Sequence, residues 1–153
     1  MAKAKFEKKG SLTLFLSKVK NVTEGPEAEA ALEAGALESA LYLANETPVR
    51  TGEAASGWAQ CAADLGQDVR ITPKDRLDRT AQGRSKGRVD KEGFGGKAKE
   101  KIIKLINGVQ HVWIIEYGVG ELNRKPLKLV PKALKIGYKK LVKEMKKIIK
   151  KVA

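Results

Sequence analysis

The residue types that most often do chemistry are scarce in this chain, which has one cysteine, Cys61, and one histidine, His111. A zinc site needs three or four ligands, and these two residues alone do not supply them. A cysteine–histidine nucleophile pair is formally possible. However, Cys61 lies in an alanine-rich stretch and is expected to be a small core residue, while His111 is expected to face solvent on a strand. The sequence therefore predicts no catalytic residue, no metal site and no cofactor.

Two carboxylates, Asp75 and Asp78, have a spacing that could suit acid–base chemistry. They alternate with cationic side chains, so local ion pairs in a solvated loop explain them better. The cations in question are Lys74, Arg76 and Arg79.

The glycine-rich run Gly93–Lys97 is weakly similar to a phosphate-binding loop, but it lacks the required spacing. Ala98 also stands where serine or threonine would serve magnesium. A basic, glycine-rich segment can still contact phosphates or a partner without specificity. The candidates for such a contact are Arg84, Lys86 and Arg88.

Charge is unevenly distributed along the 153 residues, which carry a formal net charge of +13. Residues 26–47 hold five glutamates and no basic residue, whereas the chain from Lys125 onward has eleven lysines and a single acid, Glu144. Such asymmetry is typical of chains that contact nucleic acid, an anionic membrane or an acidic protein. The length predicts a single domain over residues 1–153. The lone cysteine and the lack of a long apolar run predict a cytosolic product without a membrane span.

A C-terminal helix is expected to begin near Pro131, with apolar residues at three- and four-residue spacing and lysines opposite. The lysine face has three interpretations: a solvated surface, a nucleic-acid surface that neutralises phosphates, or a basic amphipathic membrane helix. The membrane ranks last because the apolar side is needed to cover a sheet. The lysines proposed to contact DNA or a partner are Lys139, Lys143, Lys146 and Lys150.

The remaining elements indicate an α+β fold, in which a long helix and the C-terminal helix pack on one antiparallel sheet of about four strands. Residues 1–10 form a mobile tail, and Leu12–Leu16 form an extended segment. A helix runs from Pro26 to about Glu46, because proline suits the first turn and Pro48 prevents continuation. Its two leucine-bearing flanks indicate either one enclosing core or two partners, the chain's own sheet and a neighbouring subunit.

Three further predictions concern the middle of the chain. Residues 54–63 and 67–72 are weakly predicted as strands, and residues 73–100 as a long basic, flexible loop. Asn107-Gly108 between apolar runs predicts a hairpin that joins strand 102–106 to a central strand over residues 109–117.

Two short motifs stand about sixty residues apart. The first is Thr47-Pro48-Val49-Arg50-Thr51-Gly52, followed by Trp58, and the second is Trp113-Ile114-Ile115-Glu116-Tyr117-Gly118, followed by Pro131. Proline ends a helix and glycine permits a tight turn. The two tryptophans are suited to anchor a core, and Glu116 could pair with a lysine of another subunit. Both motifs are therefore interpreted as structural.

In order and spacing these motifs resemble the neck and tail-completion proteins of tailed phages, the minor tail component family of lambdoid-type siphophages. The shared features are the first motif with its tryptophan, an Asn-Gly-type turn, a strand ending in Glu-Tyr-Gly, and a proline before the last helix. Arg50 and Glu53 depart from the family pattern.

The resemblance implies a non-enzymatic virion protein that joins head to tail as a six- or twelvefold ring around the DNA channel. Its neighbours would be the head connector or adaptor and the tail-terminator or tail-tube proteins, with non-specific DNA contact possible and no membrane partner. The chain would be made in the host cytoplasm and reside at the head–tail junction. A tail terminator is an alternative within this class, and a basic nucleic-acid-binding module is the alternative outside it.

Overall fold

The computed structural model describes residues 2–6, 12–17, 26–95, 101–118 and 125–152. The predicted mixed α+β class is confirmed. The elements in chain order are β1 (Ala2–Phe6), β2 (Leu12–Ser17), α1 (Pro26–Glu46), α2 (Glu53–Asp64), α3 (Thr80–Ser85), β3 (Gly87–Glu92), β4 (Ile102–Asn107), α4 (Val112–Tyr117) and α5 (Leu129–Val152).

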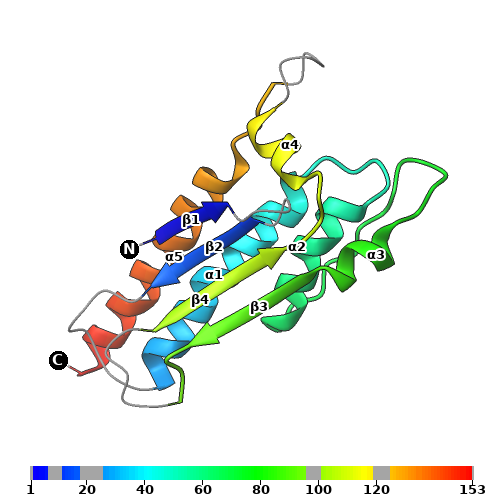
Figure 1. The fold of residues 1–153 in the computed structure, drawn as a ribbon. Helices are drawn as coiled ribbons and strands as arrows, with labels where there is room; N and C mark the ends of the chain where they lie inside the picture. Colours follow the sequence, from blue (N-terminus) through cyan, green and yellow to red (C-terminus); the bar gives the residue numbers. More distant parts are fainter. Residues whose placement is uncertain (1, 7–11, 18–25, 96–100, 119–124, 153) are drawn as a thin grey trace.

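The strands form one antiparallel sheet in the order β1-β2-β4-β3, and α1, α2 and α5 lie behind one face of it (Figure 1). In β4, Ile103, Leu105 and Asn107 alternate along the strand and are fully buried. Because alternate residues of a strand point to opposite faces, these three mark the face that the helices cover. Residues 2–6 of the predicted mobile tail are thus a strand, while residues 1 and 7–10 lie outside the described part.

α1 has the predicted bounds, and α5 begins two residues before Pro131, which therefore sits in the first turn where proline is tolerated. The two helices pack closely through small residues. A Cβ atom on Gly35 would lie 2.7 Å from the carbonyl oxygen of Gly137, and one on Gly137 would overlap Ser39 Oγ. The Ser39 hydroxyl donates a hydrogen bond to the Ala133 carbonyl oxygen at 2.8 Å. This contact lets two helix backbones approach without leaving a buried hydroxyl unsatisfied.

A single core contacts both leucine flanks of α1. Leu32 and Leu43 are fully buried, and Leu37 and Leu41 are partly buried against the same cluster. Trp58 lies in this cluster with 1% of its surface exposed, as predicted for a core anchor. The side chain of Trp113, the second predicted anchor, lies outside the described part.

The prediction of strands at 54–63 and 67–72 is wrong. Residues 53–64 form α2, and no strand is present at 67–72. The reason is compositional: alanine is the strongest helix former, and its small side chain lets α2 fit between α1, α3 and the sheet.

The prediction of a flexible loop at 73–100 is also wrong between residues 80 and 92. It contains α3 and β3, and β3 pairs with β4 from Gly87↔Asn107 to Glu92↔Ile102. The outer edge of β3 is covered by α2, because Cys61 Sγ donates to the Arg88 carbonyl and Asp64 accepts from the Val89 amide. Residues 96–100 lie outside the described part.

The predicted hairpin at Asn107-Gly108 is absent, and residues 112–117 form helix α4 instead of a central strand. Asn107 is buried; its Nδ2 donates to the Ala54 carbonyl at 2.8 Å, and its Oδ1 accepts from the Val109 amide at 3.1 Å. The Gly108 amide donates to the Lys86 carbonyl at 2.8 Å. The hairpin is absent because these bonds use the polar groups that a two-residue turn would leave to solvent. The strand is replaced by a helix because a short apolar run suits a helix as well as a strand.

We predict that Gly137→Ala destabilises the protein, because its methyl group would overlap Ser39 Oγ and lie 2.8 Å from the Gly35 carbonyl oxygen. The free energy of unfolding, measured by urea denaturation, should fall by about 1–3 kcal/mol. Lys135→Ala on the exposed side of α5 is the control and should change it by less than about 0.5 kcal/mol. Equal effects of the two substitutions would show that α1 and α5 do not pack as described.

Candidate functional site

The turn between α1 and α2 is held by backbone hydrogen bonds to the segment that precedes α3. The Thr47 amide and hydroxyl both donate to the Leu43 carbonyl, which ends α1. The Arg50 carbonyl accepts from the amides of Lys74 at 3.1 Å and Asp75 at 2.9 Å, and the Thr51 carbonyl accepts from the Arg79 amide at 2.8 Å. The turn and residues 74–79 therefore form one surface.

Glu53, at the start of α2, is a buried carboxylate shared by two cations. Lys86 Nζ lies 2.9 Å from one carboxylate oxygen and Arg79 Nη1 lies 3.6 Å from the other. Burial alone would raise the pKa of Glu53, but the bond and charge of Lys86, with the charges of His111 and Arg79, outweigh it and lower that pKa. Glu53 is therefore ionised and fixes α2 to the α3–β3 region.

The second motif also has a definite geometry. Glu116 is buried at the end of α4, and its two carboxylate oxygens accept hydrogen bonds from the amides of Leu129 at 2.8 Å and Val130 at 3.0 Å. These are the first residues of α5, where the helix dipole favours a negative group. The Leu127 and Lys128 amides donate to the carbonyls of Ile115 and Glu116. Glu116 therefore caps α5 within the same chain.

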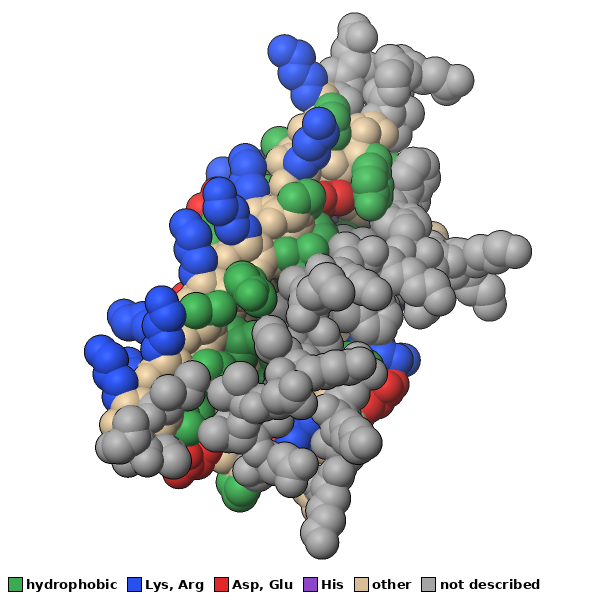
Figure 2. Space-filling view, turned by 90° about the vertical axis from the view of Figure 1, so that its left-hand side faces the viewer, with side chains coloured by type: hydrophobic (Ala, Val, Ile, Leu, Met, Phe, Trp, Pro, Cys, Tyr) green, Lys and Arg blue, Asp and Glu red, His purple; other side chains and the backbone are tan. Residues whose placement is uncertain are grey.

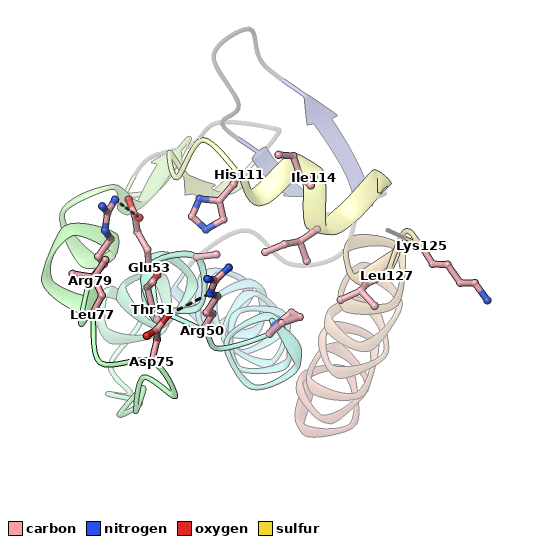
Figure 3. A pocket seen from close by; sticks show the side chains of 14 residues that line it. Arg50, Thr51, Glu53, Asp75, Leu77, Arg79, His111, Ile114, Lys125 and Leu127 are labelled. Atoms are coloured by element: carbon pink, nitrogen blue, oxygen red, sulfur yellow. Dashed lines mark hydrogen bonds and ion pairs between the residues drawn. The ribbon is translucent and has the colours of Figure 1, made fainter. Parts of the chain in front are cut away.

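An open cleft of about 590 Å³ lies between these two motifs. One side is the Pro48–Ala54 turn with Asp75, Leu77 and Arg79; the other is α4 with the segment before α5, which supplies His111, Ile114, Ile115, Lys125 and Leu127. Figure 3 shows His111, at the start of α4, pointing toward the turn that carries Arg50 and Thr51. Residues about sixty positions apart in the chain thus line the same surface.

The cleft surface combines apolar side chains on both walls with ion pairs along one wall. Leu77 and Leu127, which lie on opposite sides, are 52% and 39% exposed and are two of the large hydrophobic side chains that the described surface presents to solvent. The Arg50–Asp75 pair at 3.3 Å and the Arg79–Glu53 pair lie along one wall. Exposed leucines beside oriented charges are typical of a surface that binds a protein segment.

Arg50 and Glu53 each form an ion pair within the chain. The exposed Arg50–Asp75 pair contributes little to stability. The buried carboxylate of Glu53 is not left unpaired.

Cys61 and His111 do not form a catalytic pair. Cys61 is fully buried on α2, and burial raises the pKa of its thiol to about 12. His111 lines the cleft, whereas Cys61 does not. Among the described residues there is no group of three or more His, Cys, Asp or Glu side chains that could hold a metal ion.

The predicted site residues divide into three groups. Pro48, Thr51 and Gly52 line the cleft. Trp58, Asn107 and Glu116 are buried and maintain the fold. In the third group, Val49, Gly108 and Gly118 are half-buried, and Tyr117 and Pro131 are exposed. The side chain of Trp113 lies outside the described part.

The predicted contacts of the basic segment are largely neutralised by nearby acids. Arg84 pairs with Asp68 at 3.0 Å, Lys86 with Glu53, and Arg88 with Asp90 at 3.4 Å. The lysines of α5 differ, because Lys139, Lys143, Lys146 and Lys150 line a shallow exposed groove with Val142 and Lys147. None of the described helices is long and apolar enough to cross a membrane.

Sequence patterns missed Leu77, Leu127 and Ile115 as surface residues of the cleft. An isolated leucine in the charged run 74–79 was the available signal for Leu77. Nothing in the sequence indicated that this run folds back onto the Arg50 carbonyl.

We predict that the stability contributed by Glu116 depends on pH. Burial raises its pKa, although the two amide bonds and Lys132 oppose the shift. Because the folded pKa exceeds the unfolded value of about 4.5, this contribution is fully present in acid and is lost as pH rises through the folded pKa. The difference in unfolding free energy between wild type and Glu116→Gln should therefore shrink from pH 4 to pH 7. A difference in unfolding free energy that grows over this range would contradict the raised pKa. NMR titration of the Glu116 carboxyl carbon would measure that pKa directly.

Comparison with protein-family models, curated proteins and solved structures finds no match to this chain. Its function is therefore argued from the geometry of the cleft and of α5, together with the resemblance of the motifs.

Proposed function

We propose that this chain is a structural virion protein of the head–tail junction of a tailed phage, and that it assembles as a six- or twelvefold ring. One observation carries the proposal. Pro48, Arg50, Thr51 and Gly52 of the first motif face Ile114 and Ile115 of the second across one cleft, and exposed leucines outside the motifs stand at both walls. Residues shared for folding alone would not need to surround an open, partly apolar surface.

In this role the cleft receives a segment of a neighbouring protein. Leu77, Leu127 and the α4 isoleucines supply apolar contact area, and Arg50 and Arg79 orient polar groups at the edge. A ring requires such head-to-tail contacts, in which one surface of a subunit meets a different surface of the next. The segment 73–79 acts as a wall of the cleft in this proposal, in place of the long mobile loop expected from the sequence.

The neighbours remain those that the resemblance implies: the head connector or adaptor, and a tail-terminator or tail-tube protein. A tail terminator is the alternative within the same class. A basic nucleic-acid-binding module is the second candidate function, and the exposed lysines of α5 favour it.

We predict that Leu77→Asp combined with Leu127→Asp blocks the joining of heads to tails. Both side chains are exposed in the isolated chain, so the fold should remain intact, but two carboxylates would be placed in an apolar contact. Loss of hot-spot contacts of 2 kcal/mol or more corresponds to at least about 30-fold weaker binding. The measurement is the yield of infectious particles when the variant complements a phage that lacks its own copy, with electron microscopy of unjoined heads and tails.

Gln67→Asp is the control, because Gln67 is exposed, follows α2 and does not line the cleft. It should give a normal yield. A normal yield of joined particles with the double leucine variant, in protein shown to be folded by circular dichroism, would disprove the assembly role of the cleft.

A further inference from the structure

Six lysines of α5 form a continuous stripe on the solvent side of the helix, which we call the lysine stripe. Their spacing of three or four residues keeps them within one sector of a helix with 3.6 residues per turn, over a length of about 27 Å. All six are exposed, and Figure 2 shows basic side chains in a row along this edge of the molecule. The members are Lys132, Lys135, Lys139, Lys143, Lys146 and Lys150.

The chain does not neutralise this stripe. Glu144 is the single acid of α5, and it is paired with Lys140 at 3.3 Å and Lys147 at 3.1 Å, both of which lie beside the stripe. Among the described residues, no carboxylate forms an ion pair with a stripe lysine. Elsewhere the described surface mixes charges, as in the Lys91–Glu33 and Lys104–Glu92 pairs.

A surface helix that is merely solvated usually alternates acids and bases at these spacings, because like charges three or four residues apart repel one another. The six lysines form five pairs of like-charged neighbours, and the repulsion within these pairs opposes helix formation. A polyanion that lies along the stripe removes this repulsion.

The orientation of the stripe is fixed by the opposite side of α5. Ala133, Gly137 and Leu141 are buried against α1, and Glu116 holds the first turn. Because that apolar side is occupied by the fold, α5 cannot insert it into a lipid bilayer as an amphipathic membrane helix does. An extended polyanion is the ligand whose charge and length match the stripe.

We infer that the lysine stripe binds the phosphate backbone of duplex DNA without reading its sequence. The stripe presents one cation per about 5 Å of helix, and each strand of duplex DNA presents one phosphate per about 3.4 Å of its axis. Five lysines, four of them from the stripe, line a shallow groove of about 400 Å³ beside Val142, so their cationic groups lie close together. Lysine contacts to phosphate oxygens fix the position of a protein on the duplex but carry no sequence information directly.

This inference goes beyond the proposed assembly role and does not depend on it, since the stripe and the cleft share no residue. It can be tested on the isolated chain, so its failure is distinguishable from failure of head–tail joining.

The test is fluorescence anisotropy with a 30-base-pair duplex of mixed sequence between 50 and 200 mM KCl. Six phosphate contacts predict a slope of about −5 for the logarithm of the association constant against the logarithm of the salt concentration. The affinity for the duplex should therefore fall about 10³-fold over this range. The variant Lys139→Gln, Lys143→Gln, Lys146→Gln should have a slope shallower by about 3, so that its affinity falls only about 40-fold.

The matched control is Arg70→Gln, Lys74→Gln, Arg76→Gln, which removes the same net charge from exposed positions outside the stripe. Its slope should equal that of the wild type. The same measurement is made with a 30-nucleotide single strand, polyglutamate and phosphatidylserine vesicles. Equal slopes for the two triple variants would overturn the inference, as would tighter binding to any of these three ligands than to the duplex.

Discussion

The close packing of α2 is the constraint on which the rest of the structure depends. A Cβ atom on Gly57 would overlap the Asn107 side chain, and one on Gly87 would overlap the Gly57 carbonyl oxygen. α2 therefore lies almost in backbone contact with both β4 and the start of β3. This proximity allows Asn107 to bond to the Ala54 carbonyl and Cys61 to bond to the carbonyls of Arg88 and Ile106. The alanine-rich composition permits this packing, because larger side chains would separate the helix from the sheet.

The position of α2 in turn determines the cleft. Glu53 begins the helix and is paired with Lys86, so the segment between α2 and β3 must return over the helix N-terminus. Along this return path the amides of Lys74, Asp75 and Arg79 bond to the α1–α2 turn. Asn107 ends β4 at the same place and directs the chain into α4, which forms the opposite wall. Hydrogen bonds to backbone groups therefore position the two walls. Short sequence motifs indicate these long-range bonds only in part.

The sequence alone was sufficient to predict an element where its pattern has one physical interpretation. Proline at the start, acids in the first turn and proline beyond the end specify α1, and apolar periodicity specifies α5. It was insufficient at 54–63 and 109–117, because short alanine-rich or apolar runs fit both a helix and a strand, and tertiary contacts decide between them. The run 73–100 looked irregular since β3 has few apolar residues. That strand lies at the edge of the sheet, where α2 covers its outer side and charged side chains suit the other. For the candidate site, the sequence identified the motif residues but not that they line one cleft. No local pattern indicates that Leu77 and Leu127 lie on opposite walls of it.

Glu116 connects the two surfaces of the molecule. It belongs to α4, which forms a wall of the cleft, and its carboxylate holds the first turn of α5, which carries the lysine stripe. The surfaces nevertheless differ in the force that would drive binding. Apolar burial in the cleft is little affected by salt, whereas contact between the stripe and phosphates releases counterions and weakens steeply as salt rises. A ligand on one surface therefore need not displace a ligand on the other. Because the buried carboxylate of Glu116 holds both surfaces in place, a substitution at Glu116 is expected to disturb the cleft and the lysine stripe at once. Substitutions at Leu77 or at Lys143 are expected to act on one surface alone.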